Sequence, residues 1–216
     1  MNGRLTPEIQ ALFKTRFENN CIGLLQDAYE SIIASGRKMN EETENNITAQ
    51  LVGLMKRNPK RSSLRIHLDR ENYLDSDEIY AGLENADESP RIDIKYTTWN
   101  AKEEVEFFME AKNLAENDWQ KANGATVNAK ALRKRYIETG IFNFTSGRYL
   151  NGCLIGYVLE GSVMKVANLI NQELIQAKRP NETLNKQGSN DGNHYYISNH
   201  SGTSINTLKH FFLHLS

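Results

Sequence analysis

The amino-acid sequence predicts a single α/β domain in which helices flank a central mixed β-sheet. Helical and strand-like hydrophobic periods alternate along the chain, and 216 residues suffice for one large core. The composition, 39% hydrophobic and 25% charged, is that of an ordinary globular protein. Charges interrupt the apolar runs of the N-terminal segment, which predicts no signal peptide or membrane span and therefore a cytoplasmic protein.

The first two elements are predicted to be helices. Residues 7–35 place apolar side chains at helical spacing, with Pro7 in the first turn and Gly36 just beyond the end. A second helix is predicted for residues 40–57, with Asn40 as its N-cap.

Strands dominate the rest of the predicted fold. An acidic connection at 71–89, with a helical turn near 77–83, and a loop at 181–193 separate these elements. The elements are a strand at 64–69, a hairpin of strands at 91–99 and 105–114, a basic helix at 127–140, a buried strand at 153–159, a helix at 162–178, and strands at 194–197 and 208–215. This order divides the chain into an N-terminal helical arm (1–38), a core (40–160), and a C-terminal helix and strands that cover the sheet (161–216).

The predicted hairpin carries the chemistry. Asp93 lies between Ile92 and Ile94, so strand alternation should place its carboxylate on the face opposite both. Glu110 and Lys112 are two residues apart and share a face of a strongly apolar strand. Charges there are costly unless they are paired or bind a metal, and Mg²⁺, which Mn²⁺ could replace, suits carboxylate ligands. The alternative is a cross-strand ion pair on a solvent-facing sheet.

Asp93, followed by Glu110-Ala111-Lys112 after an apolar strand, resembles the PD-(D/E)xK nuclease superfamily, also called restriction-endonuclease-like. The resemblance implies a core of helix, three strands, helix and strand over residues 40–160, and a Mg²⁺-dependent endonuclease. Asp93 and Glu110 would be metal ligands, with Lys112 assisting the attacking water. The chain departs from the pattern because Pro90 precedes the aspartate by three residues. The segment GIFNFTSGRYLNGCLIGYVLEG is similar to small bacterial nuclease-like proteins, some of them attached to phage-defence systems.

Glu44 is the candidate for an additional metal ligand. The family often takes such an acid from its first core helix, and Glu44 lies on the apolar stripe of Ile47, Leu51 and Leu54. Glu41, one turn earlier, is the competing candidate. The other interpretation is an acid that stabilises the start of the helix.

The expected partner is nucleic acid, with DNA favoured over RNA. Lys130, Arg133 and Lys134 on the basic helix are predicted to contact phosphate, although a solvated helix face would show the same pattern. The net charge of −1 argues against binding through bulk positive charge, so target choice is expected to come from a homodimer or from a partner protein of a restriction or defence system. Two alternatives stay open: an RNA-cleaving enzyme of the same chemistry, and a non-catalytic subunit with a nuclease fold for binding or assembly.

The remaining reactive and aromatic residues are predicted to be structural. Cys21 and Cys153 lie far apart in sequence, which predicts neither a disulfide nor a cysteine zinc site. The C-terminal histidines show no metal-binding spacing, although His200 could approach the active site. The aromatic side chains near the motif are expected in the core rather than stacked on bases: Tyr136, Phe144 and Tyr149.

Overall fold

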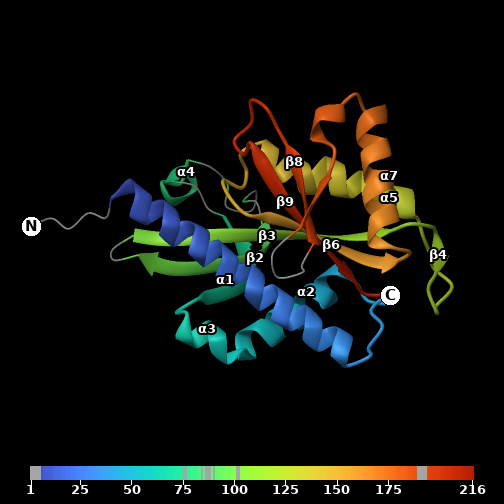
Figure 1. Ribbon diagram of the computed structural model, residues 1–216, viewed down its shortest axis with the longest axis horizontal. Helices are drawn as coiled ribbons and strands as arrows, with labels where there is room; N and C mark the ends of the chain where they lie inside the picture. The colour runs from blue at the N-terminus through green and yellow to red at the C-terminus, as the bar shows by residue number, and fades with distance from the viewer. Residues whose placement is uncertain are drawn as a thin grey trace, which may run out of the picture.

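The computed structural model describes residues 6–74, 77–83, 85, 89, 91–100, 103–188 and 194–216. The chain is an α/β structure with a seven-stranded mixed sheet flanked by helices, as predicted (Figure 1). The helices are α1 (Pro7–Ala34), α2 (Glu44–Arg57), α3 (Pro59–Ser63), α4 (Asp77–Tyr80), α5 (Ala129–Arg135), a π-helix (Tyr136–Ile141), α6 (Phe142–Thr145), α7 (Val163–Gln176) and a 3₁₀ turn (Pro180–Glu182). The strands are β1 (His67–Tyr73), β2 (Arg91–Asn100), β3 (Glu103–Ala115), β4 (Trp119–Gln120), β5 (Thr126–Val127), β6 (Cys153–Glu160), β7 (Asn185–Gly188), β8 (His194–Asn199) and β9 (Thr207–His214).

The sheet has a parallel centre and antiparallel margins. Its strand order is β1-β2-β3-β6-β9-β8-β7, and β4 and β5 form a separate two-stranded ribbon. Strands β3, β6 and β9 run parallel. Strands β2 and β1 continue the sheet in antiparallel fashion on one side, and β8 and β7 do so on the other. The site-bearing strand β3 is therefore an interior strand.

Each face of the sheet carries its own hydrophobic cluster. Helices α1 and α2 pack against one face through residues such as Leu25 and Leu51, and α5 to α7 cover the other through residues such as Tyr136 and Ile170. In Figure 1 these two groups of helices lie on opposite sides of the strands. The helix of residues 7–35 is therefore part of a packed layer, because seven of its side chains are buried.

The start of α2 differs from the prediction. Thr43, not Asn40, is its N-cap, and the Thr43 hydroxyl accepts a hydrogen bond from the Asn46 amide at 3.2 Å. Met39 is fully buried and its amide donates to the Leu215 carbonyl, so the chain turns once more before the helix can begin. Glu44 consequently occupies the first helical position.

The first strand also starts later than predicted, at His67 rather than at residue 64. Helix α2 ends at Arg57 as predicted, but the Asn58 side chain then accepts from the Lys60 amide and caps the short helix α3. Leu64 then ends α3, so the alternating pattern of residues 64–69 spans a helix end and a strand start.

The basic helix predicted at 127–140 is divided. Residues 126–127 belong to β5, and the helix proper begins at Ala129 after the N-cap Asn128. A π-helix replaces the regular α-helix from Tyr136 to Ile141. The predicted loop at 181–193 contains part of the 3₁₀ turn and strand β7, while residues 189–193 lie outside the described part.

The predicted hairpin is confirmed as β2 and β3, although residues 101–102 of its turn lie outside the described residues. The helical turn predicted near residues 77–83 is confirmed in part by α4. No helix in the described part of the chain has the length and apolar character needed to cross a membrane.

Candidate active site

The candidate site lies where β2 and β3 diverge. The two strands pair from Asn100 opposite Glu103 to Ile94 opposite Met109, and the pairing ends there. Continuing this register would place Asp93 opposite Glu110. Instead β3 continues alongside β6 on its other edge, so the sheet forks at these residues.

Strand β1 is irregular at the same level. Arg70 pairs with Ile94 and Asn72 with Ile92, while Glu71 between them has a φ of +52°. Both neighbours of β2 therefore lose regular pairing at Asp93. The prediction that Ile92 and Ile94 share a face is wrong, because they join the hydrophobic clusters on opposite faces of the sheet. The simple two-residue alternation fails where the pairing fails.

Two carboxylates lie in the fork and accept hydrogen bonds from amides of β3 that no longer pair with β2. The Ala111 amide donates to Asp93 Oδ2 at 2.7 Å, and the Asn113 amide donates to Glu44 Oε2 at 2.9 Å. Buried backbone donors need such partners, and ionised acceptors make strong ones. Strand β2 and the first turn of α2 thus each deliver one acid to the same edge of β3.

Lys112 lies at the centre of the acidic residues. Its Nζ is 2.6 Å from Glu110 Oε1, 3.6 Å from Glu44 Oε1 and 3.8 Å from Asp93 Oδ2, and it also donates to the Ala111 carbonyl. Glu110 and Lys112 are each only 5% exposed. The four predicted residues Glu44, Asp93, Glu110 and Lys112 therefore form one compact group, here called the acidic cluster.

Residues that sequence reasoning did not assign to the site hold Glu110 in place. Asn143 Nδ2 lies 3.3 Å from one oxygen of Glu110, and the Tyr149 hydroxyl lies 3.3 Å from the other and 2.7 Å from the Arg91 carbonyl. The exposed side chain of Arg148 donates to Asn143 Oδ1 at 3.1 Å. The prediction that Tyr149 lies in the core is confirmed, but its hydroxyl also reaches the cluster.

The π-helix packs against the cluster from above the sheet. A Cβ on Gly140 would lie 3.1 Å from the methyl groups of Leu154, a tight contact, and 3.5 Å from Lys112 Cγ, so the glycine packs closely against Leu154 and beside the lysine stem. Arg135, just before the π-helix, donates to Glu44 Oε1 at 3.1 Å with 55% of its side chain exposed. π-helical turns are rare and occur often at functional sites.

The cluster carries more negative than positive charge, and this shapes its titration. Burial, followed by the nearby Glu110 carboxylate, raises the pKa of Asp93 to about 7 against the opposing effects of Lys112 and the Ala111 amide. Burial acts to lower the pKa of Lys112, but Glu110, Asp93 and Glu44 together outweigh it and raise that pKa. Lys112 is therefore an ammonium ion at neutral pH.

Within the described residues, no three His, Cys, Asp or Glu side chains are arranged to hold a metal ion. In the acidic cluster the reason is visible, because the Lys112 ammonium lies between the carboxylates and supplies their counter-charge. Glu41, the competitor of Glu44, is elsewhere and accepts from the Ala122 amide at 3.0 Å.

The basic residues predicted to contact phosphate occupy different positions. Arg133 is buried and donates to Glu173 at 2.8 Å and to the Ala115 and Glu116 carbonyls. Lys130 and Lys134 are exposed, and Lys134 pairs with Glu138 at 3.6 Å.

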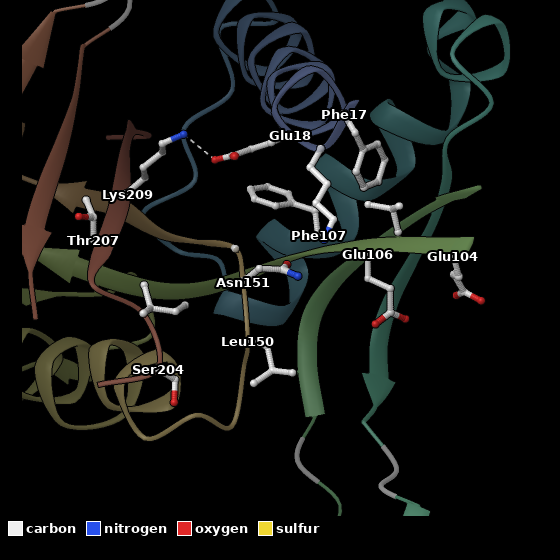
Figure 2. A pocket seen from close by; sticks show the side chains of 14 residues that line it. Phe17, Glu18, Glu104, Glu106, Phe107, Leu150, Asn151, Ser204, Thr207 and Lys209 are labelled. Carbon is white, nitrogen blue, oxygen red and sulfur yellow. Dashed lines mark hydrogen bonds and ion pairs between the residues drawn. The ribbon is translucent and has the colours of Figure 1, made fainter. Parts of the chain in front are cut away.

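A cavity of about 750 Å³ lies on another part of β3. Its lining includes Glu104, Glu106 and Phe107, and none of its lining residues belongs to the acidic cluster (Figure 2).

A second polar group, in the C-terminal region, forms a continuous buried hydrogen-bond chain. Tyr136 Oη contacts His210 Nδ1 at 2.8 Å, His210 Nε2 contacts Ser198 Oγ at 2.7 Å, and Ser198 Oγ contacts His200 Nε2 at 2.7 Å. His200 Nδ1 lies 2.7 Å from Glu182 Oε2. The possibility that His200 approaches the predicted site is not realised, because its ring joins this chain instead.

When both histidines are neutral, all the bonds of this hydrogen-bond chain can form if every group donates in the same direction. Tyr136 donates to His210, which donates to Ser198, which donates to His200, which donates to Glu182. Burial lowers the pKa of His210 to about 3 and also lowers that of His200, which agrees with neutral rings.

Ser198, His200 and Glu182 have the order of a serine hydrolase triad, but Ser198 has no exposed surface, so a substrate carbonyl cannot reach its hydroxyl. We conclude that this buried chain of hydrogen bonds has a structural role. It joins β8, β9, the 3₁₀ turn and the π-helix.

Comparisons of the chain with family models, curated proteins and solved structures found no match, so function must be argued from the geometry.

Replacing Asp93 by Asn should remove a pH-dependent destabilisation of the metal-free protein. The folded-state pKa of about 7 exceeds the ordinary 3.8, so the unfolded chain releases its proton first and stability falls as pH rises between these values. The penalty should reach about 3–4 kcal/mol above pH 7, and the Asn amide oxygen can still accept from Ala111. Urea denaturation from pH 4 to 8 in EDTA measures it, with the Glu30→Gln variant, at an exposed carboxyl group, giving the background slope. If the unfolding free energy of Asp93→Asn and that of the unmodified protein changed in parallel with pH, Asp93 would have an ordinary pKa.

Replacing Ser198 by Ala should destabilise the protein by about 2–4 kcal/mol, because two buried histidine nitrogens lose their partner. Urea denaturation at pH 7 measures this loss. Ser204→Ala, at an exposed serine in the same region, should change the unfolding free energy by less than about 0.5 kcal/mol. Equal stabilities of the two variants would contradict a structural role for the chain.

Proposed function

We propose that this protein is a metal-dependent nuclease that hydrolyses phosphodiester bonds, with the acidic cluster as its catalytic centre. The observation that carries the proposal is the convergence of Glu44, Asp93 and Glu110 on Lys112 at the fork of the sheet. Chance ion pairs on a sheet surface do not gather three acids around one buried lysine.

The proposal includes a restriction-endonuclease-like core. Its expected element order corresponds to α2, β1, β2, β3, α5 and β6, with short elements between them. The acids come from the first core helix and the second strand, and Glu110 and Lys112 come from the third. This is the distribution that the PD-(D/E)xK resemblance implies for this chain.

The donor set fits a hard divalent cation in its chemistry. Glu44, Asp93 and Glu110 offer carboxylate oxygens, which Mg²⁺ and Mn²⁺ prefer. Burial, and after it the nearby Glu110 carboxylate, raises the pKa of Asp93, so a cation bound beside it would stabilise its ionised form. A bound Mg²⁺ would supply charge neutralisation and a more acidic water.

Lys112 acts in this proposal as a charged donor and not as a base, because its pKa is raised. Released from Glu110, its ammonium would contact the scissile phosphate or orient the attacking water. Charge stabilisation of this kind is the main contribution that fixed donors make to phosphoryl transfer. Gly140 packs beside the lysine stem, and Asn143 and Tyr149 fix the carboxylate of Glu110.

The phosphate backbone of the substrate would contact Arg135 and Arg148. Both are exposed, and each is bound at the site, Arg135 to Glu44 and Arg148 to Asn143. Each guanidinium has further N–H donors for a phosphate. Lys130 and Lys134 remain candidates for more distant contacts, whereas the buried contacts of Arg133 give it a structural position.

DNA is the proposed substrate, in the setting of a restriction or phage-defence effector, with target choice supplied by a homodimer or a partner protein. An RNA-cleaving enzyme would use the same residues. A non-catalytic subunit would have no use for an unbalanced acidic centre, and for this reason we rank it below both.

Lys112→Ala should lower metal-dependent cleavage by about 100-fold or more, because it removes a donor at the phosphate. The assay uses supercoiled plasmid, linear DNA and total RNA with Mg²⁺, with Mn²⁺ and with EDTA. Lys38→Ala is the matched control, since Lys38 is exposed and lies outside both the cluster and the basic helix. Full activity of Lys112→Ala would refute the assigned centre, and a protein that neither cuts nor binds metal in calorimetry would favour the non-catalytic alternative.

Arg135→Ala and Arg148→Ala should each weaken DNA binding by about fivefold or more and lower the salt dependence by about one phosphate contact. Fluorescence anisotropy with labelled duplex DNA in EDTA, across a salt series, measures both without cleavage. Lys130→Ala and Lys134→Ala are the comparison variants on the neighbouring helix. If Lys130→Ala and Lys134→Ala weaken DNA binding more than the two arginine variants do, phosphate binds to that helix face, as the sequence pattern predicted.

A further inference from the structure

An interior strand of the sheet has an open edge. Strand β3 pairs with β2 from Glu103 to Met109, but β6 begins only at Cys153, opposite Met109. In the described ranges, no strand pairs with the other edge of β3 at residues 103–108. Open strand edges are templates for pairing with another chain.

The backbone groups that face this edge can be assigned. The Ala111 amide donates toward the β2 side, so strand alternation directs the amides of Glu104 and Glu106 toward the open edge. Gly152 agrees with this assignment, because a Cβ there would collide with the Phe108 carbonyl oxygen at the end of the edge. The amides and carbonyls of Glu104 and Glu106 are therefore available to a partner strand.

A cavity accompanies the edge and has the size of a ligand pocket, about 750 Å³. Figure 2 shows Phe107 of β3 and Phe17 of α1 on one side of the strand, with Glu104 and Glu106 pointing to the other. One end is closed by residues 150–152. The two faces of the edge thus differ in chemistry: Phe107 and Phe17 lie on one, and Glu104 and Glu106 lie on the other, where Leu150 also lines the cavity.

We propose that this edge binds an extended segment of a partner protein, in which basic and apolar side chains alternate, as an added β-strand. A strand paired with β3 would direct alternate side chains to the two faces. Basic side chains would meet Glu104 and Glu106, and apolar ones would meet Phe107 and Phe17. The backbone would bond to the amides and carbonyls at positions 104 and 106.

Of the other charges near the cavity, Lys14 of α1 is exposed and has no ion pair among the described residues, and the rest are paired. Lys209 pairs with Glu18 at 2.6 Å, and Lys95 of β2 pairs with Glu106. Glu104 has no ion pair among the described residues. On its face of the edge, it is the exposed charge that a basic side chain would meet.

Two other occupants fit less well. A second copy pairing edge to edge would place glutamates of β3 opposite each other, and such like-charge pairs are destabilising. Nucleic acid would meet the carboxylates of Glu104 and Glu106 and be repelled. The proposal is independent of the nuclease function, because no lining residue of the cavity belongs to the acidic cluster.

The test uses the full chain and a fluorescein-labelled peptide of about seven residues, a common strand length, with alternating Lys and Val. Anisotropy should show saturable binding. A peptide of the same composition with Lys and Val in separate blocks should bind at least about tenfold more weakly, and so should the alternating peptide N-methylated at every second amide, which loses its backbone bonds. Equal binding of all three peptides would overturn the proposal, because plain charge attraction would explain it, and so would no binding of the alternating peptide.

Matched variants locate the contact. Glu104→Lys should weaken binding of the alternating peptide about tenfold, whereas Glu103→Lys, an equal change of charge on the adjacent residue and the other face, should weaken it far less. Hydrogen exchange should show new protection of the Glu104 and Glu106 amides when the peptide binds. Binding without that protection, or equal losses in both variants, would place the peptide elsewhere and refute the proposal.

Discussion

The structure depends on one break in backbone pairing, the divergence of β2 from β3 beyond Ile94 and Met109. A sheet that forks leaves amide groups of the continuing strand without partners, and buried donors cannot stay unbonded at low cost. Asp93 and Glu44 supply the acceptors. The acids are therefore needed to keep β3 satisfied in the fork, and the same acids create a local excess of negative charge. The two hydrogen bonds to Asp93 and Glu44 thus both satisfy the amides of β3 and gather negative charge at the fork.

The excess of negative charge explains why Lys112 is buried and why it stays charged. An isolated ammonium ion in the interior would lose its proton, but three carboxylates within 4 Å stabilise it. Lys112 does not offset the cost of ionising Asp93, because burial first and the Glu110 carboxylate second still raise the pKa of Asp93. A metal-free cluster of this kind is a source of instability at neutral pH. Proteins tolerate such groups where a ligand or a reaction uses them. This favours the proposed catalytic role over an ion pair that has no function.

The local part of this site could be predicted from the sequence, and the tertiary part could not. Asp93, Glu110 and Lys112 belong to one hairpin, so short-range patterns were enough to group these three. Glu44 was singled out by the hydrophobic stripe of its helix together with the family resemblance. Arg135, Asn143 and Tyr149 reach the cluster from segments 33 to 91 residues away along the chain, and no period encodes that distance. The predicted start of β1 failed because Asn58 caps a new helix, and the Ile92 and Ile94 alternation failed because it assumes regular pairing on both sides of β2.

The C-terminal region, which the sequence left without a role, supports the site from behind. The buried chain of hydrogen bonds in this region ends at the hydroxyl of Tyr136, the first residue of the π-helix. That helix positions Gly140 against the Lys112 stem, and Arg135 directly before it contacts Glu44. A wider helical turn is less stable than a regular one, so it persists only where its surroundings fix it. With both histidine rings neutral, donation runs from Tyr136 to Glu182, so the direction of the hydrogen bond that holds Tyr136 depends on their protonation state. The strands at one margin of the sheet thereby help to determine the geometry at the fork near the other.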